Sequence, residues 1–375
     1  MAYVAVRGGQ RAIDEAEQLT KYYRVKNGSS PIEVKQIRDQ MRLAVDRVMS
    51  EGSLYAPDLA AIALKQAEGD TLEASFLLRA FRSTLPRNLY SLPVDTTQIR
   101  MIRRVSATFK DIPGGQFLGP TRDYTKRLIE FSLSEESEDD VKDFLDLYVG
   151  RDNVPDTLPE FPRVVDLLRA EGLLENRGLN KSERVVTDPA AAPGPSDVGD
   201  ITRQPIRFPA SRAVRMQSLS RGEQGALLAL AYSSARGYGF IHPTLGELRV
   251  GYVPVEVPHP IYEKETITVG WILVTEAEII ARMEERTEET RAQFSLGYGF
   301  CFGHNDVKAM SMATLDRAMV SEGAVAPAED EEFVLYHIDG IESSGFVSHW
   351  KLPHYVDFQA EMNRVQSIQE RRGTE

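Results

Sequence analysis

The first 90 residues place their apolar side chains mainly at helical spacing. Between residues 31 and 51 the apolar positions fall on one helical face, at Val34, Ile37, Met41, Ala44, Val45 and Val48. Together with glycine and proline stop signals, the pattern predicts a short strand over 3–6 and helices over 11–21, 31–51, 57–69 and 71–86. We interpret this region as a helical layer whose apolar stripes form a core, not a cofactor site.

Residues 99–112 are instead rich in Ile, Val, Thr and Phe, which predicts a strand. A glycine-rich turn follows, where Gly114 and Gly115 would let the backbone approach a ligand closely and Gln116 could contact it. We interpret this turn as a candidate phosphate site. Glycine pairs in such connections also serve purely steric needs.

The residues after the turn extend that hypothesis. Pro120 suits the first position of a helix, on which Arg122 and Lys126 would lie one turn apart. A glycine turn that leads from a strand into a helix N-terminus, with an arginine close by, is a physically sensible cradle for phosphate.

Strand patterns dominate the second half, after a helical stretch that begins at residue 211 and stops at Gly237. A turn before the first of these strands gathers polar residues, namely Arg236, Tyr238, His242, Glu247 and Arg249. We interpret Arg236 and Tyr238 as an alternative contact for phosphate or sugar. A long strand is predicted over residues 266–280.

Residues 294–302 alternate between two faces of a predicted strand. The aromatic and leucine side chains share one face, which we expect to be a core. The other face carries only Ser295, Gly297, Gly299 and Cys301. That face is small enough for a ligand or another backbone to lie against it. A helix capped by Asn305 or Asp306 should follow, with its methionines as core filler.

The region between these halves has a different character. Residues 135–140 are acidic, residues 188–200 are rich in Pro, Gly and Ala, and residues 162–174 between them predict one amphipathic helix. We therefore expect a helical region over 1–133, a connection over 134–200 and an α/β domain over 201–375. The predicted fold class is mixed α/β (α+β), with a helical N-terminal layer and a C-terminal sheet-containing domain.

Composition narrows the function classes. The 375 residues include 44 basic and 56 acidic side chains, and the net charge of −12 argues against bulk attraction to nucleic acid. Any anionic substrate must be gathered by local cations. A single cysteine, Cys301, excludes an internal disulfide or an iron–sulfur site made by this chain alone. No apolar run suits a signal peptide or a membrane span, so a cytoplasmic protein is expected.

Two histidines near the C-terminus form a candidate metal site. His349 and His354 are separated by four residues that include Pro353. Proline prevents a continuous helix and pushes Leu352 toward extended geometry, so the imidazoles must converge across a bend. The pair would bind one divalent ion if a third ligand came from His337, from Asp357, from a partner or from substrate. Without other information, such a pair is more often structural.

Eight stretches carry a family resemblance: AVDRVMSEG, KDIPGGQFLGPTRDYT, LALAYSSARGYGFIHP, GELRVGY, GYGFCFG, KAMSMATLDRA, DEEFVLYH and GFVSHWKLPHYVDFQAE. In this order they resemble the PhnI family of the bacterial carbon–phosphorus lyase machinery. The resemblance spans nearly the whole chain and fails mainly over residues 134–200.

The resemblance implies a role in phosphonate breakdown. Members of the family join ATP to an alkylphosphonate such as methylphosphonate, release adenine and give α-D-ribose 1-methylphosphonate 5-triphosphate. Alone, they are associated with hydrolysis of the N-glycosidic bond of ATP or GTP. The implied partners are PhnG, PhnH and PhnJ in a core complex, with PhnK and PhnL. The pair matching His349 and His354 is a zinc pair in the family, close to the boundary with PhnJ.

Displacement of adenine would pass through a state like an oxocarbenium ion, which needs negative charge near the sugar and a proton donor at the purine. Candidate carboxylates are Asp111, Asp123, Asp339 and Asp357, and we assign the role to Asp111 and Asp357. Carboxylates in such positions are more often helix caps or ion-pair partners than catalytic groups.

Two other functions remain open from the sequence. The chain could be a scaffold whose histidine pair serves PhnJ. It could also be an independent metallohydrolase of nucleotides, with the small face of residues 294–302 lining its pocket.

Overall fold

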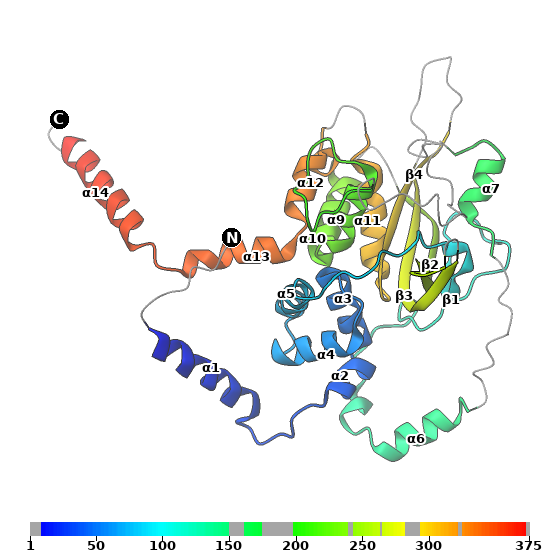
Figure 1. The fold of residues 1–375 in the computed structure, drawn as a ribbon, viewed down its shortest axis with the longest axis horizontal. Coiled ribbons are helices and arrows are strands. Elements are labelled where there is room, and N and C mark those ends of the chain that lie inside the picture. Colours follow the sequence, from blue (N-terminus) through cyan, green and yellow to red (C-terminus); the bar gives the residue numbers. More distant parts are fainter. Residues whose placement is uncertain are drawn as a thin grey trace.

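The computed structural model describes residues 9–149, 161–174, 198–238, 243–262, 265–281, 293–321 and 325–372. It combines helices with one antiparallel sheet of four strands in the order β1-β2-β3-β4 (Figure 1). The strands are β1 (Arg100–Val105), β2 (Thr244–Pro258), β3 (Thr266–Ala281) and β4 (Ser295–Phe302). The predicted mixed α/β fold is confirmed. The sheet takes β1 from the N-terminal region and its other strands from the C-terminal half.

Short helices form the N-terminal layer. The predicted helix over 31–51 is interrupted at Met41, where φ is −108° and ψ is 38°. This break separates α2 (Val34–Gln40) from α3 (Arg42–Gly52), and both pack on α4 (Pro57–Gln66). Together with α5 (Thr71–Arg82) these helices bury a hydrophobic cluster of their own, which includes Val48, Met49, Ala60, Leu64 and Leu78. The strand predicted over 3–6 lies outside the described residues.

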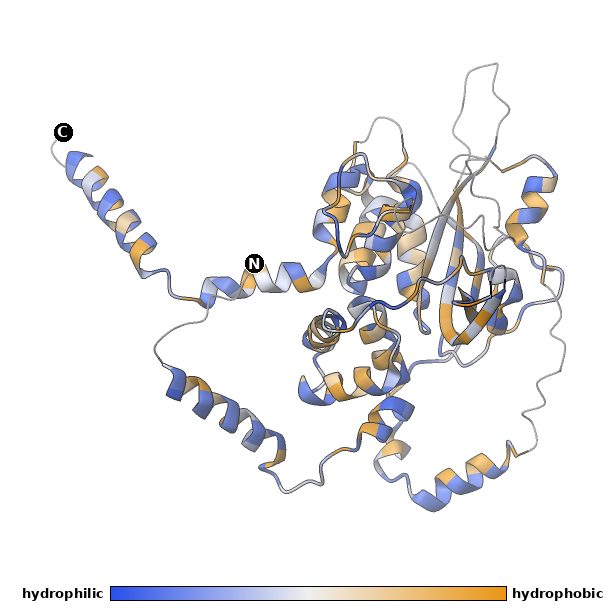
Figure 2. Ribbon diagram, in the orientation of Figure 1, coloured by the Kyte–Doolittle hydropathy of each residue, from blue (hydrophilic) through white to orange (hydrophobic). Residues whose placement is uncertain are grey.

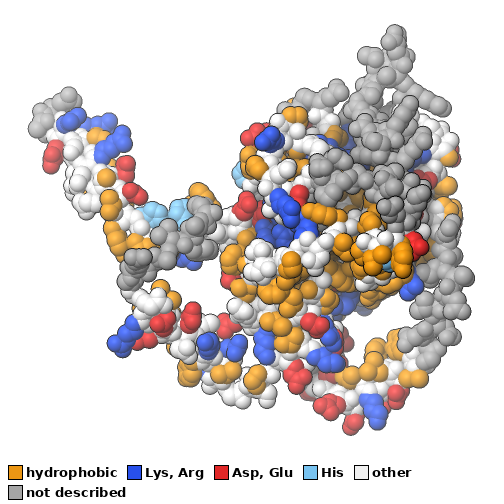
Figure 3. All heavy atoms as spheres, in the orientation of Figure 1, with side chains coloured by type: hydrophobic (Ala, Val, Ile, Leu, Met, Phe, Trp, Pro, Cys, Tyr) orange, Lys and Arg blue, Asp and Glu red, His pale blue; other side chains and the backbone are white. Residues whose placement is uncertain are grey.

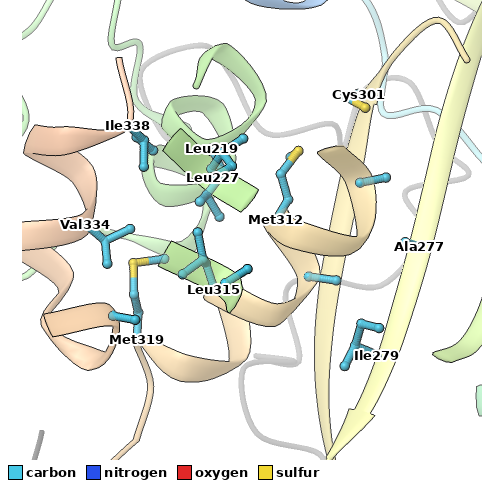
Figure 4. Packing of buried hydrophobic residues seen from close by; sticks show 14 of the residues in the cluster. Leu219, Leu227, Ala277, Ile279, Cys301, Met312, Leu315, Met319, Val334 and Ile338 are labelled. Carbon is cyan, nitrogen blue, oxygen red and sulfur yellow. The ribbon is translucent and has the colours of Figure 1, made fainter. Parts of the chain in front are cut away.

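The main core lies between one face of the sheet and the helices of the C-terminal half. These are α9 (Arg212–Arg221), α10 (Gln224–Ser233), α11 (Asp306–Ala318) and α12 (Glu331–His337). Figure 4 shows leucines of α9, α10 and α11 meeting side chains of α12. Met312 and Met319 lie within this cluster, which confirms the prediction that the methionines fill the core.

The small face of β4 contacts a helix backbone. A Cβ atom added to Gly297 would lie 2.0 Å from the carbonyl oxygen of Ala313, and one added to Gly299 would lie 2.0 Å from that of Ala309. Glycine is therefore required for α11 to seat on the sheet. The sequence allowed either a ligand or another backbone to lie against this face, and the backbone of α11 lies there. On the face expected to be a core, Leu296, Phe300 and Phe302 pack against two apolar clusters, although β4 buries its small side chains more completely.

The opposite face of the sheet is partly covered by α7 (Val164–Ala170), which lies within the predicted connection. Val165 and Leu168 of α7 pack against Ile280 of β3, at one end of this face. At the other end, Ile99 packs against Val253 and Val274 of β2 and β3. Charged side chains occupy the space between these two apolar clusters.

Several helices extend from this body. In Figure 1, α1 (Gln10–Val25), α6 (Glu138–Asp146) and α14 (Tyr355–Arg372) lie apart from the packed layers, and none of them has a buried residue. Figure 2 shows hydrophobic positions on α6 and α14 that no other element covers. Among them Phe144, Val356 and Phe358 are more than half exposed. Among the described helices, none combines the length and the apolar character needed to cross a bilayer.

Candidate functional site

The histidine pair lies on the arm formed by α13 (Gly340–Ser348) and α14. His349 begins the short 3-10 helix η6 (His349–Lys351), and His354 directly precedes α14. Leu352 is extended, with φ −76° and ψ 157°, as the following proline requires. The two ring centroids are 5.4 Å apart. The bend therefore brings the imidazoles together at the surface of the arm, where histidine side chains are visible in Figure 3.

The hydrogen bonds of both rings leave the same nitrogen free. The Nδ1 atom of His349 contacts the carbonyl oxygen of Phe346, and that of His354 lies 2.6 Å from the oxygen of Leu352. A carbonyl only accepts, so Nδ1 must carry the proton in each ring. Histidines that bind metal commonly donate their other nitrogen to a carbonyl in this way. The chemistry of the pair therefore fits a divalent ion held by two Nε2 atoms.

Within the part of the chain that the structure describes, no third ligand joins the pair. Across the described residues, no group of three or more His, Cys, Asp and Glu side chains could hold a metal. His337 instead donates from Nδ1 to the oxygen of Phe333 at 2.6 Å, and its ring stacks on the Phe333 ring. Asp357 lies exposed in the first turn of α14. The remaining ligands would have to come from a partner, from substrate or from water.

The glycine-rich turn is held by protein contacts. Arg104 donates from Nη1 to the oxygen of Pro113 at 2.5 Å and from Nε to Glu247 at 2.5 Å. Gly114 has a φ of +83°, and a Cβ atom added there would lie 2.3 Å from the Phe161 ring. Glycine at this position thus allows the side chains of Arg104 and Phe161 to pack against the turn. This is the purely steric role of a glycine that the sequence had left open.

Gln116 is likewise engaged within the turn. Its side-chain oxygen accepts from the backbone N–H of Ser106 at 2.8 Å, and its side-chain nitrogen donates to the oxygen of Lys110 at 3.0 Å. Gly115 donates its backbone N–H to Ile112. Asp111 lies exposed on the same turn.

The helix predicted to begin at Pro120 does not form. Residues 119–130 contain no helix, and Arg127 adopts a left-handed φ of 52°. Asp123 accepts from Arg103 of β1 at 2.5 Å and from Arg127 at 3.2 Å, which ties the segment to the sheet. This stretch also contains Thr121, Asp123 and Thr125, which are poor helix formers. The predicted helix is therefore wrong, and Arg122 and Lys126 are exposed cations on an irregular segment.

The polar residues predicted to crowd one turn are separated. Arg236 is exposed in the π-helical turn η4 (Ser234–Tyr238), which also includes the backbone of Tyr238. His242 lies outside the described residues. Glu247 and Arg249 are buried in β2. The carboxylate of Asp339 caps α13 and accepts two hydrogen bonds from Arg79, so it is both a cap and an ion-pair partner.

A buried polar layer crosses the face of the sheet under α7. Glu276 of β3 pairs with Arg249 of β2 and accepts from the Tyr298 hydroxyl at 2.7 Å, while Arg163 donates to Glu278 at 3.0 Å. Burial, reinforced by the nearby Glu276, raises the pKa of Glu278 to about 7. Charged residues two apart inside a predicted strand were the sequence signal for this layer. Because these side chains are covered by protein, they contribute to the fold and do not form an open site.

A cluster of charged residues around one histidine, which the sequence did not reveal, lies where β4 meets α11. His304 is 7% exposed and is the buried histidine of the described residues. Its Nδ1 lies 3.0 Å from Arg42 Nη1, and its Nε2 lies 3.2 Å from Asp306 Oδ1. The other oxygen of Asp306 lies 3.0 Å from Arg103 Nε, and the backbone N–H of His304 donates to Asp46 at 3.0 Å.

This cluster joins three parts of the fold. Arg42 and Asp46 come from α3, Arg103 comes from β1, and His304 and Asp306 flank the start of α11. Gly303 allows the chain to turn, with a φ of +73°. The sequence signal would have been the Gly-His-Asn-Asp run directly after an alternating strand.

A family model and two known proteins match this chain over nearly its whole length. The family model described as "Bacterial phosphonate metabolism protein (PhnI)" matches residues 2–372. A protein of Escherichia coli (strain K12) named alpha-D-ribose 1-methylphosphonate 5-triphosphate synthase subunit PhnI is 46% identical over 373 residues, which cover 98% of each chain. A protein of the same name from Rhizobium meliloti (strain 1021) is 45% identical over 376 residues, covering 98% of this chain and 94% of the relative.

Proposed function

This chain belongs to the PhnI family of bacterial phosphonate metabolism proteins, and we propose that it is a subunit of an α-D-ribose 1-methylphosphonate 5-triphosphate synthase. The observation that carries the proposal is 46% identity, over nearly all of both chains, to a relative with that name. In the proposed reaction, an alkylphosphonate such as methylphosphonate displaces adenine from C1′ of ATP. Without its partners, the chain would hydrolyse the N-glycosidic bond of ATP or GTP.

Transfer and hydrolysis use different nucleophiles, a phosphonate oxygen and water, which need different help from the protein. A phosphonate oxygen is already anionic at neutral pH and needs positioning more than it needs a base. Water needs a carboxylate to remove its proton. One site could therefore support both transfer and hydrolysis. Asp111 on the glycine-rich turn and Asp357 beside the histidine pair remain our candidates for the carboxylate that faces the sugar.

Cations at the surface would gather the anionic groups. Arg122 and Lys126 are exposed after the glycine-rich turn, and Arg236 is exposed after α10. We assign triphosphate binding to these side chains as point charges, without the helix N-terminus that the sequence had suggested. Tyr238 and the backbone of Gly114 to Gln116 are further proposed contacts.

We also propose that His349 and His354 hold zinc. A divalent ion there would screen the negative charge of a phosphoryl or phosphonate group. The free Nε2 atoms support this assignment, since each Nδ1 atom is already bonded to a carbonyl. The missing ligands would then come from substrate or from a neighbouring subunit.

The proposed partners are PhnG, PhnH and PhnJ, together with PhnK and PhnL, in the cytoplasm. The relatives are named as subunits, and exposed apolar side chains on α6 and α14 would be covered by other proteins.

A scaffold role is the second candidate function. In that case the histidine pair would serve PhnJ and take no part in adenine release. The observation in its favour is the incomplete ligand set of the described residues, on an arm that projects from the body. The independent metallohydrolase considered above is less well supported, because α11 fills the face of β4 that would have lined its pocket.

One experiment separates these functions. The purified chain is incubated with ATP, with and without methylphosphonate and the partner subunits, and adenine is followed by chromatography. The synthase function predicts adenine release by the chain and formation of the ribose phosphonate ester when methylphosphonate and partners are present. A scaffold would give no adenine unless another subunit supplied the activity.

A further inference from the structure

We propose that His304 donates the proton to the departing purine. In this proposal Asp306 stabilises the charged form of His304, and Arg42 covers His304 Nδ1 until the phosphate groups of the nucleotide bind. This assignment rests on the proposed function, because it supplies the proton donor that cleavage of the N-glycosidic bond requires. None of the carboxylates suggested by the sequence provides it.

The contacts of His304 define where its proton lies. A guanidinium group only donates hydrogen bonds, so His304 Nδ1, 3.0 Å from Arg42 Nη1, must accept. The proton of the neutral ring is then on Nε2, which lies 3.2 Å from Asp306 Oδ1 but outside the geometry of a hydrogen bond. Nδ1 is the nitrogen that would take up and deliver a second proton.

Asp306 is arranged to stabilise that second proton. Its Oδ1 atom is buried, makes no hydrogen bond within the described residues and lies 3.2 Å from His304 Nε2, so its negative charge acts on that ring as well as on Arg103. Its Oδ2 atom is held by Arg103. Asp46 adds a further carboxylate at the backbone of His304. A carboxylate this close to an imidazole stabilises the imidazolium through its charge, without the hydrogen bond that orients the ring in catalytic triads.

In this proposal Arg42 blocks His304 Nδ1 and leaves it when the nucleotide binds. Its side chain is exposed, and its two hydrogen bonds go to neutral acceptors, His304 Nδ1 and the oxygen of Pro120 at 3.2 Å. Among the described residues it makes no ion pair within 4.0 Å. A polyphosphate would bind the guanidinium more strongly than these neutral groups do. Nucleotide binding would thus remove Arg42 from Nδ1, which then takes a proton from water.

The step balances in protons and electrons. The bond between C1′ and N9 breaks and its electron pair stays on the purine, which receives the Nδ1 proton of His304 at a ring nitrogen. The phosphonate oxygen forms the new bond to C1′. The proton lost by His304 is replaced, through solvent, by the hydroxyl proton of the phosphonate monoanion, or by that of the attacking water in hydrolysis.

The test compares two leaving groups in the wild type and in His304→Gln, using the full chain with its partner subunits. Guanine must be protonated to leave GTP readily, whereas the base of 7-methyl-GTP already carries a positive charge and leaves without a proton. We expect His304→Gln to lower base release from GTP by about 10²- to 10⁴-fold. Release from 7-methyl-GTP should fall by less than about tenfold, because its base needs no acid.

Controls separate this role from a structural one. His259→Gln, in the turn between β2 and β3, should change neither rate. Asp306→Asn, which keeps the ring, should lower GTP cleavage and spare 7-methyl-GTP, and it decides the question if His304→Gln does not fold. Equal losses on both nucleotides, or no loss on GTP, would overturn the assignment. If the wild type releases no base from either nucleotide, the proposed function itself fails, and the assignment fails with it.

Discussion

The two histidine clusters of this protein differ in how they are held. His349 and His354 lie close in sequence, on an arm with few contacts to the body, and each bonds only to a nearby carbonyl. His304 is buried, and its ring meets Arg42, which is 262 positions away along the chain. The arm leaves the Nε2 atoms of two histidines without a hydrogen bond among the described residues, whereas the body surrounds one histidine ring with Arg42 and Asp306. Binding and proton transfer would thus be separated within one chain.

The largest effect should come from the arm. Replacing His349 and His354 together by alanine should remove bound zinc completely, because no third ligand from the described residues would remain to hold it. Metal content of the purified complex measures this, and phosphonate-dependent growth should be lost as well. His337→Ala is the matched control and should retain the metal. Full metal content in the double variant would refute the zinc assignment.

Substitution of one glycine in the body and one in the arm should change the free energy of unfolding differently. Gly303 has a φ of +73°, and an added Cβ atom would lie 2.4 Å from the Cβ atom of Asp46. Gly303→Ala should therefore lower the free energy of unfolding by about 2–5 kcal/mol.

Gly345 of α13 has no atom within 4 Å of such a Cβ atom. Gly345→Ala should therefore stabilise its helix by up to about 1 kcal/mol. Denaturant unfolding of both variants tests the difference. Equal effects would show that the arm is as tightly packed as the body.

The buried polar layer should make the stability of the body depend on pH. The pKa of Glu278 is raised to about 7, so the folded state holds a proton that the unfolded chain releases at lower pH. Stability should be greatest below the unfolded pKa and should fall, by on the order of 2 kcal/mol, as pH rises through about 7.

Thermal unfolding between pH 4 and pH 8 measures this slope. Glu278→Gln should flatten it, and Glu17→Gln on α1 should leave it unchanged. A slope that survives in Glu278→Gln would assign the effect to another group.

The smallest effect should come from an exposed cation. Arg122→Ala should raise the KM for ATP by roughly fivefold, since an exposed charge contributes about 1 kcal/mol or less. Lys142→Ala, an exposed cation on α6, provides the matched control and should leave the KM unchanged. An unaltered KM in Arg122→Ala would move the phosphate site elsewhere.

Local patterns predicted the elements that local forces determine. The alternation in β4 and the methionine helix after it were correctly placed, because their hydrophobic periods are encoded within a few residues. The proline bend that brings His349 and His354 together was predicted for the same reason. Asn305 stands at the N-cap of this helix as expected, but its side chain makes no cap hydrogen bond. The break at Met41 was missed, because it depends on how α2 and α3 pack on α4.

The remaining errors came from distant contacts. A helix after Pro120 was predicted, but Asp123 is tied to Arg103 of β1, an interaction absent from any local window. The glycine-rich turn suggested a ligand, yet Arg104 and Phe161 occupy the space that Gly114 leaves. The cluster around His304 draws on α3, β1 and α11, so no spacing rule could have found it.

We have proposed that this chain exchanges the adenine of ATP for an alkylphosphonate. The most direct test of this proposal is to mix the chain, its partner subunits, ATP and methylphosphonate, and to measure free adenine and the ribose phosphonate ester in the same sample. We expect equal amounts of both products, and adenine without the ester when methylphosphonate is omitted. Intact ATP in the complete mixture, with all subunits assembled, would contradict the proposal.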